Sequence, residues 1–199
     1  MEYLKYILPV YLIVFYGAAV FWRSFQLWKR TGINPLVLDK GNSVQCFAGR
    51  VYRLISGIIP LIVAIYLISD HWYQCLIPIA WLEQITLKIT GLVLLTLALM
   101  LIIVAQVQMG NSWRIGIDEN AKTDLVQQEI FKFSRNPIFL GMRITFLGLF
   151  LILPNAATLV ILVLGDVLLQ IQVRLEEEYL TKTHSENYLA YCQRVRRWI

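Results

Sequence analysis

The sequence contains few of the residues that build metal centres and disulfide frameworks. Its 199 residues include only two histidines and three cysteines, and these show no metal-ligand spacing. An odd number of cysteines without such spacing supports neither a set of disulfides nor a zinc site. We therefore expect no bound metal.

Charged residues are also scarce. They make up 16% of the chain, whereas hydrophobic residues make up 58% and the mean hydropathy is +0.61. A water-soluble domain carries more charge, so this composition predicts an integral membrane protein. The length suits one helical bundle without a separate soluble domain. We treat residues 1–199 as a single membrane domain, with three spans in 1–107 and the functional half in 108–199.

Five apolar runs approach the roughly 20 residues that a helix needs to cross the hydrocarbon core. They cover residues 4–22, 51–69, 85–107, 137–153 and 156–173. The sequence thus predicts an all-α fold, a polytopic membrane bundle of about five transmembrane helices. The apolar piece at 72–82 is too short to cross. It either lies along the lipid headgroups, as its aromatic residues suggest, or belongs to a kinked second span.

Lysine and arginine are unevenly distributed along the chain. Segment 23–53 holds six of them, segment 108–136 four and the tail 174–199 five, whereas only Lys5 and Lys88 flank the other side. The positive-inside rule predicts that the basic segments and the C-terminus are cytoplasmic and the N-terminus is outside, in an inner, plasma or equivalent membrane. We therefore attribute the net charge of +5 to the orientation of the chain in the membrane. Nucleic-acid binding is not indicated, because the sequence has no basic helix or motif for it.

The last two runs are joined by Pro154-Asn155, a turn dipeptide, and so predict a tight antiparallel hairpin over residues 137–173. Its cytoplasmic ends bring Arg135 and Arg174 to the same small volume. The tail has aromatic and apolar residues at helical spacing, which predicts an amphipathic helix at the membrane interface that covers this volume. These residues are Tyr188, Tyr191, Cys192, Val195 and Trp198.

The start of this hairpin has a helix-opening pattern. Pro137 suits the first position of a helix that Asn136 or Ser134 caps. One face of the following helix carries little side-chain bulk, which serves either close helix packing or a gap for a ligand. This face consists of Gly141, Thr145 and Gly148.

A run of charged residues begins where the last apolar run ends. It consists of Arg174, Glu176, Glu177 and Glu178. Such a run at a helix end commonly faces solvent. The expected tail helix would instead cover it and turn an exposed end into a pocket, so both interpretations stay open here.

Two ionisable residues lie inside the hairpin itself. Arg143 stands eleven residues before Pro154, and Asp166 stands eleven residues after Asn155. In an antiparallel hairpin both lie about 16 Å from the turn, where an unpaired charge costs at least about 2.5 kcal/mol. We therefore expect them to pair, either as a structural contact or as part of a site for a substrate headgroup.

Several of these segments, taken in order, resemble one family. The succession runs Arg135-Asn136-Pro137-Ile138-Phe139-Leu140-Gly141, the apolar hairpin, Arg174-Leu175-Glu176-Glu177, Tyr188-Leu189-Ala190-Tyr191 and Arg194-Val195. It resembles the C-terminal half of the isoprenylcysteine carboxyl methyltransferases and related phospholipid methyltransferases. Their pattern is Arg-His-Pro-x-Tyr-x-Gly, a Glu-Glu pair, and Tyr-x-x-Tyr before a basic end. The resemblance covers about residues 108–197, whereas 1–107 match only as a set of spans.

The chain departs from the family pattern at three positions. Asn136 stands where the family usually has His, Phe139 where it has Tyr, and Glu129 where a Gly is common. Asparagine keeps a hydrogen-bonding side chain but does not titrate near neutral pH. It is therefore compatible with cofactor binding but not with a proton-transfer role.

The resemblance implies a methyltransferase that binds S-adenosylmethionine at the cytoplasmic end of the hairpin. The implied catalytic residues are Arg135, Arg174 and Glu177, and the implied cofactor-binding residues are Asn136, Pro137, Gly141, Glu176, Tyr188 and Tyr191. An arginine fork suits the cofactor's carboxylate, a glutamate its ammonium or ribose, and an aromatic ring its adenine or sulfonium. The apolar setting favours a lipid-borne or isoprenoid-bearing acceptor with a carboxylate, thiol or amine.

Two alternative functions remain open at this point. Some membrane sterol or enone reductases carry a similar Ser-Arg-His-Pro segment and bind NADPH near it, although this chain is short for that group. A lipid-binding bundle without enzymatic activity would use the charged clusters only as interfacial anchors. Binding of S-adenosylhomocysteine or of NADPH to the purified protein separates the three hypotheses.

Overall fold

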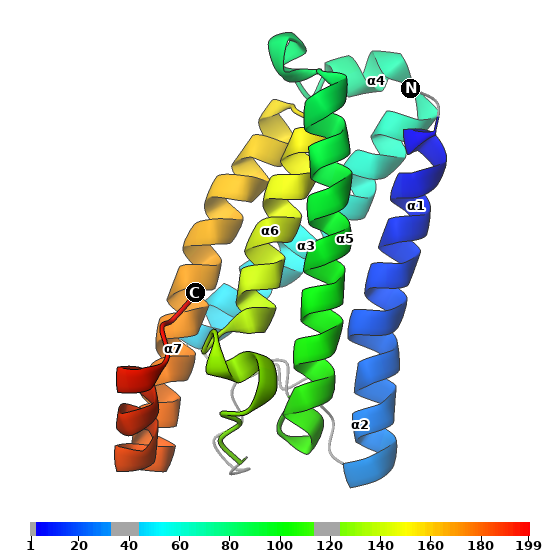
Figure 1. Cartoon of the computed structure of the whole chain (residues 1–199). Helices are drawn as coiled ribbons and strands as arrows, with labels where there is room; N and C mark the ends of the chain where they lie inside the picture. The colour runs from blue at the N-terminus through cyan, green and yellow to red at the C-terminus, as the bar shows by residue number, and fades with distance from the viewer. Residues whose placement is uncertain (1–2, 33–43, 114–123) are drawn as a thin grey trace.

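The computed structural model describes residues 3–32, 44–113 and 124–199, which form an elongated helix bundle (Figure 1). One rod is made of three segments in unbroken succession: α1 (Leu4–Val14), the π-helical segment η1 (Phe15–Trp22) and α2 (Arg23–Thr31). The other long elements are α3 (Val44–Ile68), α5 (Ile85–Met109), α6 (Pro137–Ile152) and α7 (Ala156–Arg194). The described residues form no sheet, which agrees with the all-α prediction.

Four of these helices are long and apolar enough to cross a membrane. They are Leu4–Arg30, Cys46–Ile68, Ile85–Met109 and Ala156–Arg194. The chain is thus an integral membrane protein with four long candidate spans. The fifth expected span, at 137–153, differs, because α6 has only 16 residues. At about 1.5 Å per residue it covers about 24 Å, less than a hydrocarbon core of about 30 Å.

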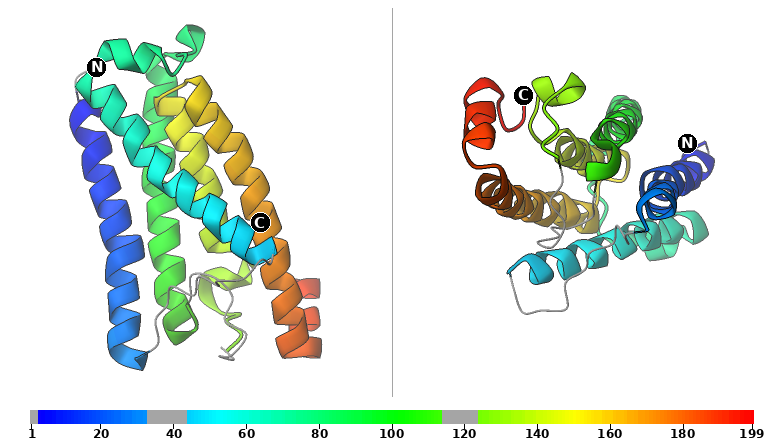
Figure 2. Two further views of the ribbon diagram at one scale, coloured as in Figure 1. Left: turned by 180° about the vertical axis from the view of Figure 1, so that it is seen from behind. Right: turned by 90° about the horizontal axis from the view of Figure 1, so that it is seen from below.

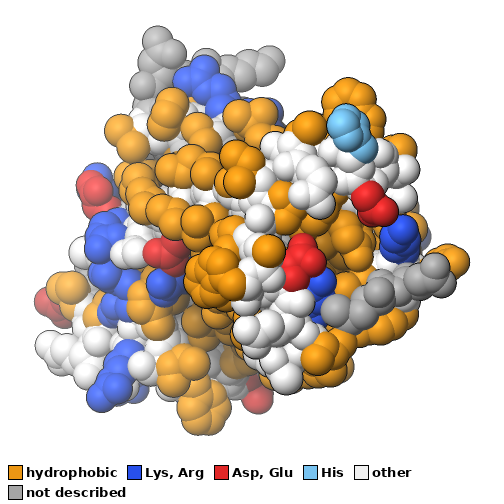
Figure 3. Space-filling model, turned by 90° about the horizontal axis from the view of Figure 1, so that it is seen from above, with side chains coloured by type: hydrophobic (Ala, Val, Ile, Leu, Met, Phe, Trp, Pro, Cys, Tyr) orange, Lys and Arg blue, Asp and Glu red, His pale blue; other side chains and the backbone are white. Residues whose placement is uncertain are grey.

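The surface of the bundle is rich in apolar side chains. Seen from the α4 end, hydrophobic side chains make up much of the visible face (Figure 3). Large apolar residues are also exposed along α5, where Val93, Leu97, Met100 and Val104 lie on the outside. An exposed apolar surface of this extent marks a membrane-facing protein.

The segment at 72–82 is separate from the second span. It contains the short helix α4 (Asp70–Gln74) and the 3-10 turn η2 (Ala80–Leu82). Ser69 interrupts the helix with an extended conformation, and its side chain caps α4, so the alternative of a kinked second span is wrong. Trp72 and Trp81 are exposed, as expected for aromatic residues at an interface.

The turn between α6 and α7 confirms the predicted hairpin. Asn155 caps α7, because its side chain accepts a hydrogen bond from the Thr158 N–H at 3.0 Å and its own N–H donates to Thr158 Oγ1 at 3.2 Å. The Ile79 N–H donates to the Pro154 carbonyl at 2.8 Å. Both the local cap and the η2 region therefore hold the turn in place.

The small face of α6 serves helix packing. A side-chain carbon added at Gly141 would lie 2.5 Å from Ile102 of α5, and one at Gly148 would lie 3.0 Å from the Gly91 carbonyl. The backbones of α5 and α6 approach each other closely along this face. Of the two interpretations of the small residues, close packing is the one observed, since α5 fills the space that a ligand would need.

The tail differs from the expected interfacial helix. α7 continues without interruption past Val173, so residues 174–184 extend the last span instead of leaving it. At Ser185, with φ 45° and ψ −119°, the chain reverses, and the following turns of helix fold back beside α7 (Figures 1 and 2). The straight part of α7 before Ser185, residues 156–184, covers about 44 Å, more than a hydrocarbon core of about 30 Å. The polar part after Val173 therefore extends beyond the apolar layer.

Candidate functional site

The site is built around the entry to α6. Pro137 occupies the first turn of the helix, as expected, but the Asn136 side chain makes no capping bond. Its Nδ2 donates instead to Glu177 Oε1 and to the Arg197 carbonyl, each at 3.3 Å. Of the two caps expected for α6, Asn136 is therefore not one, whereas the Ser134 hydroxyl accepts the Asn136 N–H at 3.2 Å.

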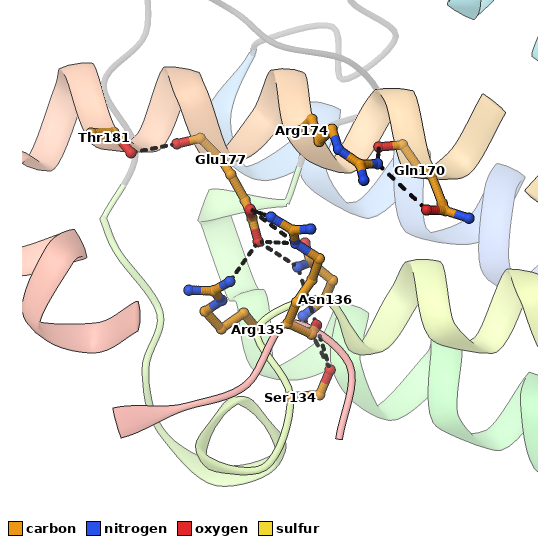
Figure 4. Close-up of polar contacts among 8 residues, drawn as sticks. Ser134, Arg135, Asn136, Gln170, Arg174, Glu177 and Thr181 are labelled. Carbon is orange, nitrogen blue, oxygen red and sulfur yellow. Dashed lines mark hydrogen bonds and ion pairs between the residues drawn. The ribbon is translucent and has the colours of Figure 1, made fainter. Parts of the chain in front are cut away.

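Glu177 lies at the centre of a compact set of charges. Its carboxylate accepts Arg197 Nη2 at 2.7 Å and Arg197 Nε at 3.1 Å, and Arg135 Nη2 lies 3.0 Å away. We call Glu177, Arg135, Asn136 and Arg197 the Glu177 cluster. Figure 4 shows Arg135 and Asn136 turned toward Glu177. The side chains of Glu177 and Arg135 are only 13% and 11% exposed.

The Glu177 cluster carries more positive than negative charge. Two guanidinium groups face one carboxylate among its members. The hydrogen bonds with Glu177 raise the pKa of Arg197, so this arginine stays charged. In addition, Arg135 Nε is buried and has no hydrogen-bond partner among the described residues. A buried donor without a partner costs about 1–3 kcal/mol, so this place suits a further anion.

The segment 195–199 covers this end of the bundle. Its backbone is held by residues before α6: the Arg135 N–H donates to the Arg196 carbonyl at 3.1 Å, and the Ser134 hydroxyl donates to the Arg197 carbonyl at 3.4 Å. The expected cover over the cluster is thus present. It is formed by an extended segment after the last helix turn and not by a helix lying on the membrane.

Tyr188 and Tyr191 lie under this cover. Both are buried, and their ring centroids are 6.1 Å apart. The Tyr191 hydroxyl donates to the Phe131 carbonyl in the 3-10 turn η4 (Glu129–Lys132) at 2.6 Å. Tyr191 therefore attaches the last turns of α7 to the linker before α6, and Tyr188 packs near its ring.

The structure places Arg174 and Glu176 outside the cluster. Arg174 is exposed and donates to the Gln170 carbonyl at 2.9 Å, and Figure 4 shows it pointing toward Gln170. The expectation that Arg135 and Arg174 share one small volume is wrong, since Arg197 holds the position beside Glu177. Glu176 is partly buried. Its burial and the neighbouring Glu177 raise the pKa of Glu176 to about 7.

Arg143 and Asp166 pair as the sequence predicts. Arg143 Nε donates to Asp166 Oδ1, and Gln170 Nε2 donates to Asp166 Oδ2 at 2.8 Å. The Arg143 guanidinium lies 4.5 Å from the centre of the Trp198 ring. Each of the two residues lies eleven positions from the turn. Because the rise per residue of a helix is constant, equal separations place them at the same height in the hairpin.

Sequence reasoning missed two contacts of the tail. Arg197 was counted among the basic residues of the tail without a partner, and Trp198 was placed on the apolar stripe of the tail without a contact to Arg143. The sequence shows a cationic and an aromatic residue side by side at Arg197 and Trp198. Their contacts with Glu177 and Arg143, however, depend on the chain reversal at Ser185. No group of three or more His, Cys, Asp or Glu residues in the described part of the chain is arranged to hold a metal ion.

An apolar helix bundle with four candidate spans and a buried, charged cluster at one end defines the class as an integral membrane protein. The family model described as phospholipid methyltransferase matches residues 86–187, just over half of the chain. The chain belongs to this family and is an S-adenosylmethionine-dependent phospholipid methyltransferase. No curated protein and no solved structure matches it. The match spans α5, α6 and most of α7, whereas Arg197 and Trp198 lie beyond it.

Proposed function

We propose that the chain methylates the amine of a phospholipid headgroup at the cytoplasmic membrane surface, with the amino acid end of S-adenosylmethionine held by the Glu177 cluster. The observation that carries this proposal is the buried Nε of Arg135, which has no hydrogen-bond partner within residues 3–32, 44–113 and 124–199, beside the buried carboxylate of Glu177. A carboxylate ligand would accept the hydrogen bond of Arg135 Nε, and an ammonium ligand would pair with the Glu177 carboxylate.

The residues present fit the cofactor's groups. Arg135 would hold the carboxylate of the cofactor, and Glu177 would hold its ammonium in the place that Arg197 occupies here. Asn136 Nδ2, now shared between Glu177 and the Arg197 carbonyl, keeps Glu177 in place. When bound, the cofactor supplies an electrophilic methyl group on its sulfonium. The remaining task of the protein is to align an acceptor in a site shielded from water, which lowers the barrier by several kcal/mol.

The headgroup amine is the acceptor that the chemistry favours. Methyl transfer needs a lone pair, and the phosphate and ester oxygens of a phospholipid are weak nucleophiles compared with an amine. A protonated amine must first lose its proton. Glu176 is suited to accept it, because the pKa of this carboxyl is raised to about 7, close to working pH. Among the acceptors considered, a carboxylate or a thiolate is already deprotonated and would not need this step.

The proposed cytoplasmic position rests on charge distribution. The segments 23–53, 108–136 and 174–199 hold six, four and five basic residues, of which Lys40, Arg114 and Lys122 lie outside the described residues. A reporter that is active only in the cytoplasm, fused to each terminus, tests the orientation. Activity at the C-terminal fusion alone supports it, and activity at the N-terminal fusion contradicts it.

Calorimetry on detergent-purified protein tests the cofactor site. We expect S-adenosylhomocysteine to bind, NADPH not to bind, and Arg135→Ala to weaken S-adenosylhomocysteine at least tenfold, which is about 1.4 kcal/mol. Lys182→Ala is the matched control, because its partner Glu178 is exposed and the pair lies on the same helix. Equal affinity of Arg135→Ala and Lys182→Ala for S-adenosylhomocysteine would show that Arg135 is not part of the cofactor site.

A methylation assay tests the acceptor. The purified enzyme with labelled S-adenosylmethionine should label phosphatidylethanolamine in mixed micelles but not phosphatidylglycerol, which has no amine. Glu176→Gln should move the pH dependence of kcat, since a carboxyl that titrates near pH 7 is removed. An unchanged pH profile would exclude Glu176 as the proton acceptor.

A further inference from the structure

One face of α7 carries polar residues deep into an otherwise apolar helix. Asp166, Gln170 and Glu177 lie within about 40° of one another on this face, since a helix turns by about 100° per residue. Glu177 belongs to the Glu177 cluster, and Asp166 lies about 16 Å further along the axis. The face thus leads from the proposed cofactor site into the apolar part of the bundle.

Arg143 presents a guanidinium to this face in a half-covered setting. The side chains of Arg143 and Asp166 are 30% and 31% exposed, although both lie inside helices that are otherwise apolar. Of the guanidinium nitrogens of Arg143, only Nε makes a hydrogen bond among the described residues, and its acceptor is Asp166. Trp198 covers one face of the guanidinium. The two Nη groups of Arg143 keep the fork geometry that binds a phosphate.

The charge balance of the pair restricts what can bind there. Arg143 and Asp166 together are neutral, and charges in an apolar setting are costly unless they are compensated. A headgroup with one phosphate and one ammonium keeps the site neutral, since the phosphate faces Arg143 and the ammonium faces Asp166. An anionic headgroup without an amine would leave one uncompensated negative charge.

We propose, building on the proposed function, that Arg143 and Asp166 recognise the zwitterionic headgroup of the phospholipid acceptor as it enters, with Arg143 on the phosphate and Asp166 on the ammonium before this group gives up its proton. Gln170 is a positioning residue, because it holds the second oxygen of Asp166. Trp198 closes the site from the side of the tail. Its neighbour Arg197 holds Glu177, so one segment covers both the headgroup site and the proposed cofactor site.

Lipid competition tests the charge-balance argument on the full-length enzyme in detergent micelles. Methylation of phosphatidylethanolamine is measured with phosphatidylcholine or phosphatidylglycerol as competitor. In the wild type we expect the zwitterionic competitor to inhibit at least tenfold more strongly. In Asp166→Asn this preference should fall at least tenfold, because the remaining charge on Arg143 suits an anionic lipid. Affinity for S-adenosylhomocysteine should stay within twofold of the wild type.

A second set of variants covers the case that Asp166→Asn fails to fold. The double variant Arg143→Leu/Asp166→Leu leaves no charge unpaired, and Trp198→Ala alters only the cover. We expect the double variant to lose the preference between the two competitors and Trp198→Ala to raise the KM for phosphatidylethanolamine at least fivefold. Trp72→Ala is the matched control, since Trp72 is an exposed tryptophan of the separate short helix α4.

The outcomes separate this inference from the proposed function. If the wild type methylates phosphatidylethanolamine but the lipid preference is the same in wild type, Asp166→Asn and the double variant, the headgroup site is refuted and the methyl transfer reaction stands. If the wild type methylates no phospholipid amine, the proposed acceptor fails and the headgroup site fails with it.

Discussion

Replacing Glu177 by Gln tests the central charge cluster of the structure. The substitution keeps the shape of the side chain and removes the charge that faces Arg135 at 3.0 Å and Arg197 at 2.7 Å. Arg135 is 11% exposed, so its guanidinium would remain buried beside a second positive charge. We expect this loss of a buried partner to destabilise the protein and to abolish binding of the cofactor's ammonium.

The size of the effect follows from burial. Removing one partner of a buried ion pair costs about 3–5 kcal/mol, and we take the lower limit, about 3 kcal/mol, because Arg197 is 37% exposed and its contribution is screened by solvent. For a chain of this size about 1 kcal/mol shifts Tm by about 2–4 °C. Glu177→Gln should therefore lower Tm by about 6–12 °C.

The neighbouring residue provides the control. Glu178 pairs with Lys182, but the two side chains are 62% and 73% exposed, so Glu178→Gln should leave Tm unchanged within error. Thermal unfolding in detergent, followed by intrinsic fluorescence, measures both variants, and calorimetry with S-adenosylhomocysteine measures binding. A shift below about 2 °C in Glu177→Gln, or equal shifts in both variants, would refute the argument that Glu177 is a buried, charge-balancing carboxylate.

Three further predictions concern separate parts of the molecule. Single neutral substitutions of Arg143 or Asp166 should each destabilise, whereas the double variant should recover most of the loss; a coupling below about 0.5 kcal/mol in a double-mutant cycle would contradict the pairing. Gly148→Leu should destabilise by about 1–3 kcal/mol through overpacking against α5, and an unchanged Tm would contradict the close approach there. Burial raises the pKa of Glu176 to about 7, so the folded state binds the extra proton and stability falls as pH rises from about 4.5 to 7. Glu176→Gln should therefore be more stable than the wild type at pH 8, and the difference should shrink at pH 5.

Much of the fold was predictable from local features. Hydrophobic runs of membrane length predicted the long helices, because the hydrocarbon core sets the length that a span needs. Pro154-Asn155 predicted the hairpin, because turn formation and helix capping involve only near neighbours. The Arg143 and Asp166 pair followed from their equal distances to that turn. The bounds of α6 were predicted to within one residue, as 137–153, but at 16 residues the helix is shorter than the four candidate spans.

The candidate site was predictable only in part. The motif around Asn136 and the run containing Glu177 were identified as meeting at one end of the hairpin, and the structure brings them together. The arginine that meets Glu177 was misassigned. Arg174 is close to Glu177 in sequence, but it is exposed on α7 and donates a hydrogen bond to the Gln170 carbonyl. Arg197 instead reaches Glu177 from the tail.

The sequence by itself determined that the chain is a membrane-embedded helix bundle, that its last two apolar runs form a hairpin, and that it belongs among phospholipid methyltransferases. These properties depend on composition, periodicity and ordered motifs along the chain. Only the tertiary structure decided which arginine neutralises Glu177 and what covers Arg143. Both depend on the backbone reversal at Ser185, a single local change of direction that no helical period encodes and that brings distant residues together.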